Sequence, residues 1–231
     1  MNYSCFVTDI GKSTLGQSIN FWNFNSNQKT EILIIGGVHG DELEGVELAE
    51  ALVKEIITCD KEVNLKLKDK IGVIPCLNPD GKILNKRSNY NNVDLNRNLP
   101  TSNWKRDATN ERYQPGKEAG SEPETKAFLV FLEKIRPNII ISLHSYSKNL
   151  VLYPVSELSL KYKSAIDNFA RKLTYPVVEA MDYDIFGNLS RFGIENKYVT
   201  MTLELPKGFQ LVDIKNKFLP PLIELLNEVS N

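Results

Sequence analysis

Short apolar runs alternate along this chain with longer segments that have the periodicity of helices. The runs are continuous and brief, which is typical of strands buried on both faces of a parallel sheet. They lie at Ile32–Val38, Lys70–Leu77 and Asn138–Leu143. A fourth strand is predicted at Tyr198–Leu205, where apolar and polar residues alternate strictly and Glu204 belongs to the polar side.

Four helices are predicted in the segments that separate and follow these strands, since apolar residues recur there at helical spacing. Strands that alternate with helices predict an α/β fold. We expect a single domain over residues 1–231, with a mixed, largely parallel β-sheet flanked by helices. The predicted helices cover Asp41–Thr58, a segment opened by Ser121-Glu122-Pro123-Glu124 and ending near Ile135, Leu158–Leu173, and Asp213–Val229.

Local signals indicate where several of these elements begin and end. Ser121 is predicted to cap the second helix, with Pro123 in its first turn. The run Asn78-Pro79-Asp80-Gly81 is predicted to be a turn that stops the second strand. Pro220-Pro221 is predicted to kink the last helix or to start a new one. The segment Lys82–Ala119 is polar and lacks regular periodicity, and loops of this length are usually functional.

Composition is that of an ordinary globular protein, with 42% hydrophobic and 25% charged residues among 231. The net charge of -1 gives no electrostatic reason to expect a nucleic acid or membrane partner. Cys5, Cys59 and Cys76 are too few and scattered for a disulfide framework, so free or buried thiols are expected. With no secretory signal pattern and no run near the roughly 18 apolar residues of a membrane helix, we expect a cytoplasmic protein, monomeric by default.

The chain contains only two histidines, His39 and His144, and each comes directly after a predicted strand. Glu42 follows His39 by three residues. Two imidazoles and a carboxylate are the ligands of a catalytic zinc site, which keeps its fourth position for water. A lone histidine could instead have a structural role, held by hydrogen bonds. Two histidines with the same placement after a strand favour the interpretation as metal ligands. Asp41 and Glu44 fit better as acids in the first turn of a helix.

Further candidate residues lie in the polar segment and at the end of the last strand. Ligands gather beyond the carboxyl ends of strands in open α/β sheets, so Glu204 is expected beside the histidines as a general base. Arg97 has a planar fork suited to a carboxylate, and Asn96 adds a directional donor. Arg87 supplies a further cation. A solvated polar loop is the plainer interpretation of this segment.

Six motifs, spanning about residues 32–206, carry a family resemblance. They are His39-Gly40-Asp41-Glu42, Asn78-Pro79-Asp80-Gly81, Val93-Asp94-Leu95-Asn96-Arg97-Asn98, Ser121-Glu122-Pro123-Glu124-Thr125, Leu143-His144-Ser145 and Thr202-Leu203-Glu204-Leu205. In this order they resemble the zinc carboxypeptidase family, and within it the short bacterial murein peptide amidase group. The set is specific, although the second and fourth motifs are weak when taken singly.

The resemblance implies one zinc ion per chain, held by His39, Glu42 and His144. It also implies that Glu204 is the general acid and base of the reaction. Arg87 matches the arginine that stabilises the tetrahedral oxyanion in this family.

Four other positions also follow from the resemblance. Asn96 and Arg97 match the pair that binds the free carboxylate of the substrate. Asp94 matches a carboxylate that orients a zinc-binding histidine. Tyr183 is a candidate for the mobile tyrosine of the family, one place away from the usual spacing before Glu204.

The function implied is zinc-dependent hydrolysis of an amide bond next to a free carboxylate in a small peptide. The substrate of the group is a murein peptide cut between γ-D-glutamate and meso-diaminopimelate, which suits recycling of cell-wall fragments. Residues 147–159 and 179–191 are expected to form walls of the substrate pocket, because they lie beside His144 and before Glu204.

Two alternatives remain open. An N-acyl amino acid deacylase of the aspartoacylase or succinylglutamate desuccinylase type shares the His-Gly-x-Glu and Asp-Leu-Asn-Arg elements. The Asn-Pro-Asp-Gly and Ser-Glu-Pro-Glu-Thr motifs, and the lack of an obvious β-domain after Glu204, count against it. A binding module that has lost catalysis is the non-enzymatic alternative, and the intact set of His39, Glu42, His144 and Glu204 counts against that.

Overall fold

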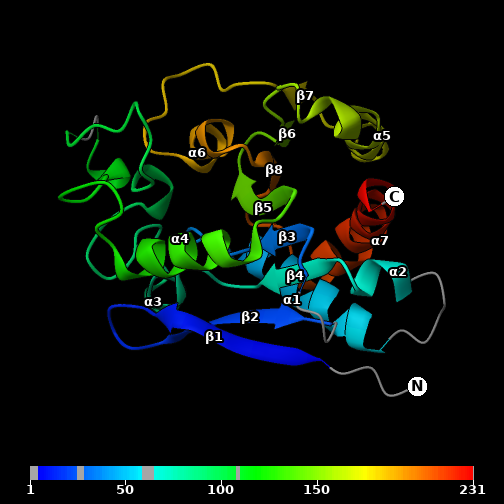
Figure 1. The fold of residues 1–231 in the computed structure, drawn as a ribbon, viewed down its shortest axis with the longest axis horizontal. Coiled ribbons are helices and arrows are strands. Elements are labelled where there is room, and N and C mark those ends of the chain that lie inside the picture. Colours follow the sequence, from blue (N-terminus) through cyan, green and yellow to red (C-terminus); the bar gives the residue numbers. More distant parts are fainter. Residues whose placement is uncertain (1–4, 25–28, 59–64, 108–109, 231) are drawn as a thin grey trace.

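The computed structural model describes residues 5–24, 29–58, 65–107 and 110–230, and in this part of the chain eight strands form one sheet (Figure 1). The central strands are parallel and the outer ones mostly antiparallel. This confirms the predicted mixed, largely parallel sheet. From edge to edge the order is β1 (Phe6–Lys12), β2 (Ser18–Asn23), β4 (Ile71–Ile74), β3 (Ile32–Ile35), β5 (Ile139–Tyr146), β8 (Val199–Pro206), β6 (Leu150–Leu152) and β7 (Val177–Val178).

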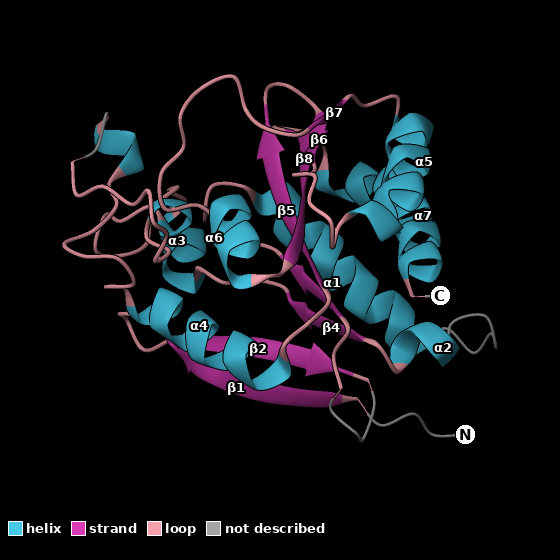
Figure 2. Cartoon of the chain, turned by 45° about the horizontal axis from the view of Figure 1, so that its top comes forward, coloured by secondary structure: helices cyan, strands magenta, loops and turns pink. Residues whose placement is uncertain are grey.

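Helices cover both faces of the sheet (Figures 1 and 2). On one face lie α1 (Leu43–Thr58), α5 (Lys163–Leu173) and α7 (Leu211–Val229), and on the other lie α4 (Pro123–Ile135) and α6 (Leu189–Asn196). Two short helices, α2 (Leu65–Lys68) and α3 (Pro79–Leu84), flank β4 in the chain. Helices on both faces explain why the central strands are apolar without interruption.

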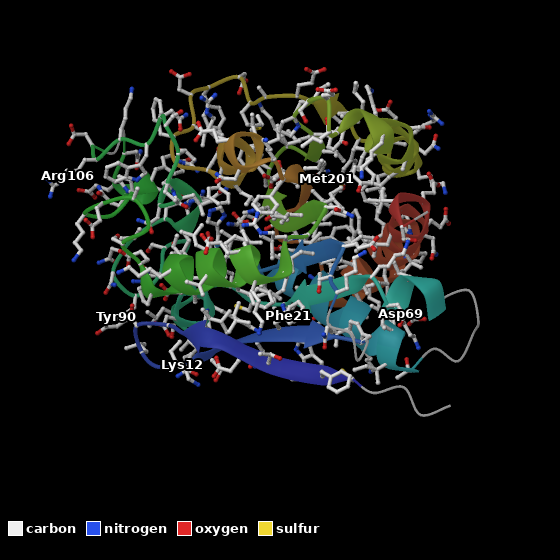
Figure 3. The ribbon with its side chains drawn as sticks, viewed as in Figure 1. Lys12, Phe21, Asp69, Tyr90, Arg106 and Met201 are labelled. Carbon is white, nitrogen blue, oxygen red and sulfur yellow. The ribbon has the colours of Figure 1, made fainter. Side chains whose placement is uncertain are left out.

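The core is divided into two layers by the sheet itself. In β3, Ile32 and Ile34 pack toward α1, whereas Leu33 and Ile35 pack toward α4, as the alternation of side chains along a strand requires. Figure 3 shows Phe21 between β2 and α4, where its ring lies 4.5 Å from that of Phe131.

The strands β3 and β4 are shorter than the apolar runs that predicted them, whereas β5 extends past the predicted end at Leu143 to Tyr146. His144 was predicted to follow this strand, but it lies within β5. The predicted turn at Asn78-Pro79-Asp80-Gly81 is wrong, since Pro79 begins helix α3. The side chain of Asn78 accepts a hydrogen bond from the N–H of Gly81. Asparagine and proline favour the first residues of a helix as well as turns. These residue types alone therefore do not show whether a turn or a helix forms at this point.

One prediction about helix ends is also wrong, and a second is wrong in part. Ser121 does not cap α4, because its hydroxyl donates to Glu122 Oε1 and accepts from Asn98 Nδ2. Pro220 and Pro221 lie inside α7, which continues through them, so they do not start a new helix, and the alternative that they kink this helix stays a prediction. The carbonyls that they leave without a donor belong to Asn216 and Lys217, which are exposed to water. In addition, α5 begins at Lys163, after a 3₁₀ turn at Leu160–Tyr162.

Several elements were not predicted from the sequence: β1, β2, β6, β7, α2 and α6. Cys5 and Cys76 are free thiols, as expected, and Cys59 lies outside the described residues. Among the helices of the described ranges, none has both the length and the apolar character needed to cross a membrane.

Helix α1 packs closely on the centre of the sheet at Gly45. A Cβ atom added there would lie 2.4 Å from the carbonyl oxygen of Leu143, one residue before His144. The missing side chain therefore allows the first turn of α1 to approach β5. This approach sets the distance between Glu42, just before α1, and His144 on β5.

We predict that Gly45→Ala lowers the free energy of unfolding by about 1–3 kcal/mol, because the added methyl group forces α1 away from β5. Urea unfolding followed by circular dichroism measures the change. Lys54→Ala, at an exposed position of the same helix, is the control and should change stability by less than about 0.5 kcal/mol. Equal stability of Gly45→Ala and the wild type would contradict the close packing.

Candidate active site

Three buried side chains converge from separate elements beyond the carboxyl ends of the central strands. His39 lies in the loop after β3, Glu42 immediately precedes α1, and His144 lies near the end of β5. His39 Nδ1 is 2.9 Å from Glu42 Oε1, and His144 Nδ1 is 2.9 Å from Glu42 Oε2. The two Nδ1 atoms are 3.1 Å apart. The parallel order of β3 and β5 brings the two histidines to the same edge of the sheet.

This group has the chemistry of a zinc site. Zinc prefers imidazole and carboxylate ligands in a tetrahedral arrangement, in which bonds of about 2.1 Å place ligand atoms roughly 3.4 Å apart. The group His39, Glu42 and His144 could hold a metal ion. Burial raises the pKa of Glu42, but the two histidines outweigh it and hold that pKa well below its usual value. Glu42 is therefore a carboxylate anion, as metal binding requires.

A second carboxylate fixes the ring of His39. Asp94 Oδ1 lies 3.2 Å from His39 Nε2, and Asp94 Oδ2 accepts a hydrogen bond of 2.9 Å from Arg87 Nε. Arg87 Nη1 also donates to Glu42 Oε1 at 3.3 Å. Asp94 is fully buried, and despite this burial the charges of His39 and Arg87 lower its pKa. Asp94 thus stays ionised and orients the ring so that Nδ1 faces Glu42.

Glu204 lies beside this group because its strand is in register with β5. His144 on β5 pairs with Glu204 on β8, so the two side chains leave neighbouring strands at the same level. Burial raises the pKa of Glu204 to about 7, and the nearby Glu42 adds to this effect. A carboxyl group with a pKa near neutrality can accept and return a proton at physiological pH.

Arg97 is a buried cation that has no carboxylate partner among the described residues. Its side chain is 9% exposed, and Nη1 donates to the carbonyl of Asn96 at 2.8 Å. The ring of Tyr113 lies 5.0 Å from its guanidinium and 5.2 Å from that of Arg87. Burial lowers the pKa of Arg97. A buried charge without a partner is costly, so this position favours an anionic ligand.

Asn96 positions one wall of the same cleft. Its Oδ1 accepts a hydrogen bond of 2.9 Å from the N–H of Leu189, at the start of α6. This bond ties the segment that carries Arg97 to α6.

All nine of the predicted site residues except Asp94 line one cleft of about 210 Å³. Tyr183 is among them, and its side chain is 48% exposed. Both segments expected to form walls contribute side chains. Residues 147–159 supply Leu152, whereas residues 179–191 supply Met181, Tyr183, Ile185, Asn188, Leu189 and Ser190. Asp94 lies behind His39 and Arg87.

Sequence reasoning missed several residues of the cleft. Tyr113, which lies beside both arginines, sits in a segment without periodicity, so no pattern singled it out. Arg112 and Lys207 also line the cleft and both approach Asp41. The position of Lys207, just beyond the strand of Glu204, is a signal that could have found it.

Asp41 and Glu44 do more than begin a helix. Glu44 accepts hydrogen bonds from Ser145 Oγ at 2.7 Å and from the N–H of Gly208 at 2.6 Å. Asp41 Oδ2 accepts one of 2.8 Å from Lys207 Nζ. These contacts join α1 to the ends of β5 and β8, next to the two histidines.

Comparison with known proteins agrees with this geometry. The zinc carboxypeptidase family matches residues 3–228 of the chain. Murein peptide amidase A of Vibrio campbellii is 28% identical over 212 residues, which are 86% of this chain and 79% of that protein. The crystal structure of murein-tripeptide amidase from Escherichia coli O157 superposes with a TM-score of 0.75 at 27% identity, covering 96% of this chain and 91% of that one.

A more distant structure shares the fold alone. Bovine thrombin-activatable fibrinolysis inhibitor, solved with a tick carboxypeptidase inhibitor, superposes with a TM-score of 0.78 at 21% identity and covers 98% of this chain and 89% of that one. The family match extends over nearly the whole chain, and the cofactor of the family is zinc. The protein is a zinc-dependent hydrolase of the metallocarboxypeptidase type. The chain belongs to the zinc carboxypeptidase family.

Proposed function

We propose that this protein hydrolyses an amide bond whose leaving amino acid carries a free carboxylate. The observation that carries the proposal is the buried cation of Arg97, which has no carboxylate partner among the described residues and lies in the same cleft as Glu204 and the histidines. The cation offers a planar fork of donors that matches a carboxylate. Because Arg97 lines the same cleft as the histidines, a carboxylate bound there would bring the neighbouring amide bond to the reacting centre.

The residues of the cleft divide the chemistry among them. His39, Glu42 and His144 would hold zinc, which when bound polarises a carbonyl oxygen and lowers the pKa of water toward about 7. Glu204 accepts a proton from the attacking water and passes it to the nitrogen of the leaving amine. Its raised pKa suits both steps, since the carboxylate form takes up the proton and the acid form returns it.

Arg87 would stabilise the oxygen that becomes negative in the transition state. Its Nε and Nη1 are fixed by Asp94 and Glu42, and Nη2 has no hydrogen-bond partner within the described ranges. A guanidinium fixed in this way donates without having to reorganise, which is how such groups lower a reaction barrier. Tyr183, at the exposed rim, would cover the bound substrate.

The more specific proposal concerns the substrate. Relatives that match most of this chain are murein peptide amidases, and the described cleft is small enough to suit a short peptide. We therefore infer a murein peptide cut between γ-D-glutamate and meso-diaminopimelate. A cytoplasmic role in the recycling of cell-wall fragments stays a prediction.

The substrate proposal predicts that zinc-loaded protein releases diaminopimelate from L-Ala-γ-D-Glu-meso-diaminopimelate, detected by chromatography of the free amino acid. Release of an ordinary C-terminal residue instead would contradict the substrate but not the chemistry. Turnover of N-acetylaspartate or succinylglutamate without peptide cleavage would favour the deacylase alternative. Glu204→Gln serves as the control, since it removes the proton acceptor while the three candidate ligands remain. It should lose turnover and still bind about one zinc ion per chain.

Arg97→Met should lower kcat/KM for peptides with a free C-terminal carboxylate by about 100-fold, because a charged hydrogen-bonding pair is lost and the substrate is misplaced. The same peptides with a C-terminal amide should be cleaved slowly and equally by both proteins. Arg171→Met, at an exposed position of α5, is the matched control and should behave as the wild type. An equal loss on acid and amide peptides would contradict a carboxylate-binding role.

The pH dependence follows from Glu204. As the pH falls through its pKa, the carboxyl group becomes protonated and can no longer accept a proton, so kcat/KM should fall on the acid side. Burial raises this pKa from 4.5 to about 7, and the positive charge of a zinc ion lowers it again. The midpoint of the acid limb is therefore expected between these two values. A flat profile through the acid range would show that another group is the base.

A further inference from the structure

Two cations of the cleft have no part in the chemistry described above. Lys207 and Arg112 both line the cleft, as do Arg87 and Arg97. Lys207 Nζ lies 2.8 Å from Asp41 Oδ2, and Arg112 Nη2 lies 3.7 Å from the same oxygen. Within the described ranges these two cations share one carboxylate. The pair therefore carries an excess positive charge that faces the cleft.

The backbone at Lys207 is fixed on both sides, although its side chain is partly exposed. The N–H of Lys207 donates to the carbonyl of Tyr146, and the N–H of Gly208 donates to the buried carboxylate of Glu44. Asp41 then directs the ammonium group. Three groups thus hold one surface lysine in place, whereas exposed ion pairs in general contribute little to a fixed site.

Two of these cations, Arg97 and Lys207, are tied to elements that cover opposite faces of the sheet. Arg97 is tied to the start of α6, through the bond between Asn96 and Leu189. Lys207 is tied to Asp41, beside the start of α1, which covers the opposite face. His144 and Glu204 lie opposite one another on the paired strands β5 and β8, and Lys207 directly follows β8. All of these residues line the same cleft. If the leaving residue is bound at Arg97 and the scissile bond lies at Glu204, Lys207 is available to the acyl half of the substrate.

We propose that Lys207, supported by Arg112 and positioned by Asp41, is a specificity residue that binds a second carboxylate, on the acyl half of the substrate. This inference rests on the proposed function. A glutamyl residue joined through its γ-carboxyl keeps a free α-carboxylate close to the scissile bond, so it presents an anion on this side. Lysine binds a carboxylate as a point charge, and the nearby guanidinium adds a planar donor. The enzyme would therefore select anionic acyl groups.

The test compares L-Ala-γ-D-Glu-meso-diaminopimelate with the same peptide whose glutamate α-carboxylate is a carboxamide. The wild type should cleave the peptide with the free α-carboxylate with a kcat/KM about tenfold higher than that of the carboxamide peptide. A factor of this size corresponds to the free energy of one charged hydrogen bond. Lys207→Met should reduce kcat/KM for the acid to that of the amide, mainly through KM, and leave the amide unchanged. Arg112→Gln should produce a smaller loss in the same direction.

Lys215→Met, at an exposed position of α7, is the matched control and should keep the acid preference of the wild type. Equal cleavage of the two peptides by the wild type, or an equal loss on both in Lys207→Met, would overturn the inference. If the wild type cleaves neither peptide, the murein substrate is wrong. A second pair of peptides then tests the inference: one has N-acetylglutamyl and the other N-acetylglutaminyl before the same C-terminal residue. Equal turnover of these two peptides overturns the inference.

Discussion

The carboxylate of Glu42 is the interaction on which the rest of the site depends. Its two oxygens lie 2.9 Å from the Nδ1 atoms of His39 and His144, and all three residues are buried at the base of the cleft. Three ligand groups can meet there only because α1 approaches β5 at Gly45, where no side chain intervenes. The packing of one helix on the sheet therefore determines whether the protein can bind a metal.

Most charged side chains around this centre form ion pairs, whereas Glu204 and Arg97 do not among the described residues. Asp94 and Arg87 neutralise one another and hold His39 and Glu42 in place. In the part of the chain that the structure describes, no cation is bonded to Glu204, and burial raises its pKa to about 7. Arg97 lacks a carboxylate within the described ranges. The groups without partners are those expected to act on water and on the substrate, since an unsatisfied charge is stabilised by binding or by proton transfer.

The central sheet and the metal-binding group were predictable because each depends on short-range patterns. Buried parallel strands are apolar along their whole length, and the order of strands and helices places their carboxyl ends at one edge. The outer strands β1, β6 and β7 gave no such pattern, because each has a partner on at most one side or spans only a few residues. At Asn78 and Ser121 the same residue types suit two local structures, and distant hydrogen bonds decide between them.

The sequence by itself determined the α/β fold class, the type and number of the candidate metal ligands, and the candidate base Glu204. These follow from residue identity and from periodicity along the chain. The tertiary structure decided which charges are paired and which are free. Tyr113 meets Arg87 and Arg97, and Asp41 meets Lys207, across long separations in sequence. Pairing and burial depend on distances in space, which the sequence does not give. Only the folded chain therefore shows that Arg97 has no carboxylate partner among the described residues and that Asp41 orients the ammonium group of Lys207.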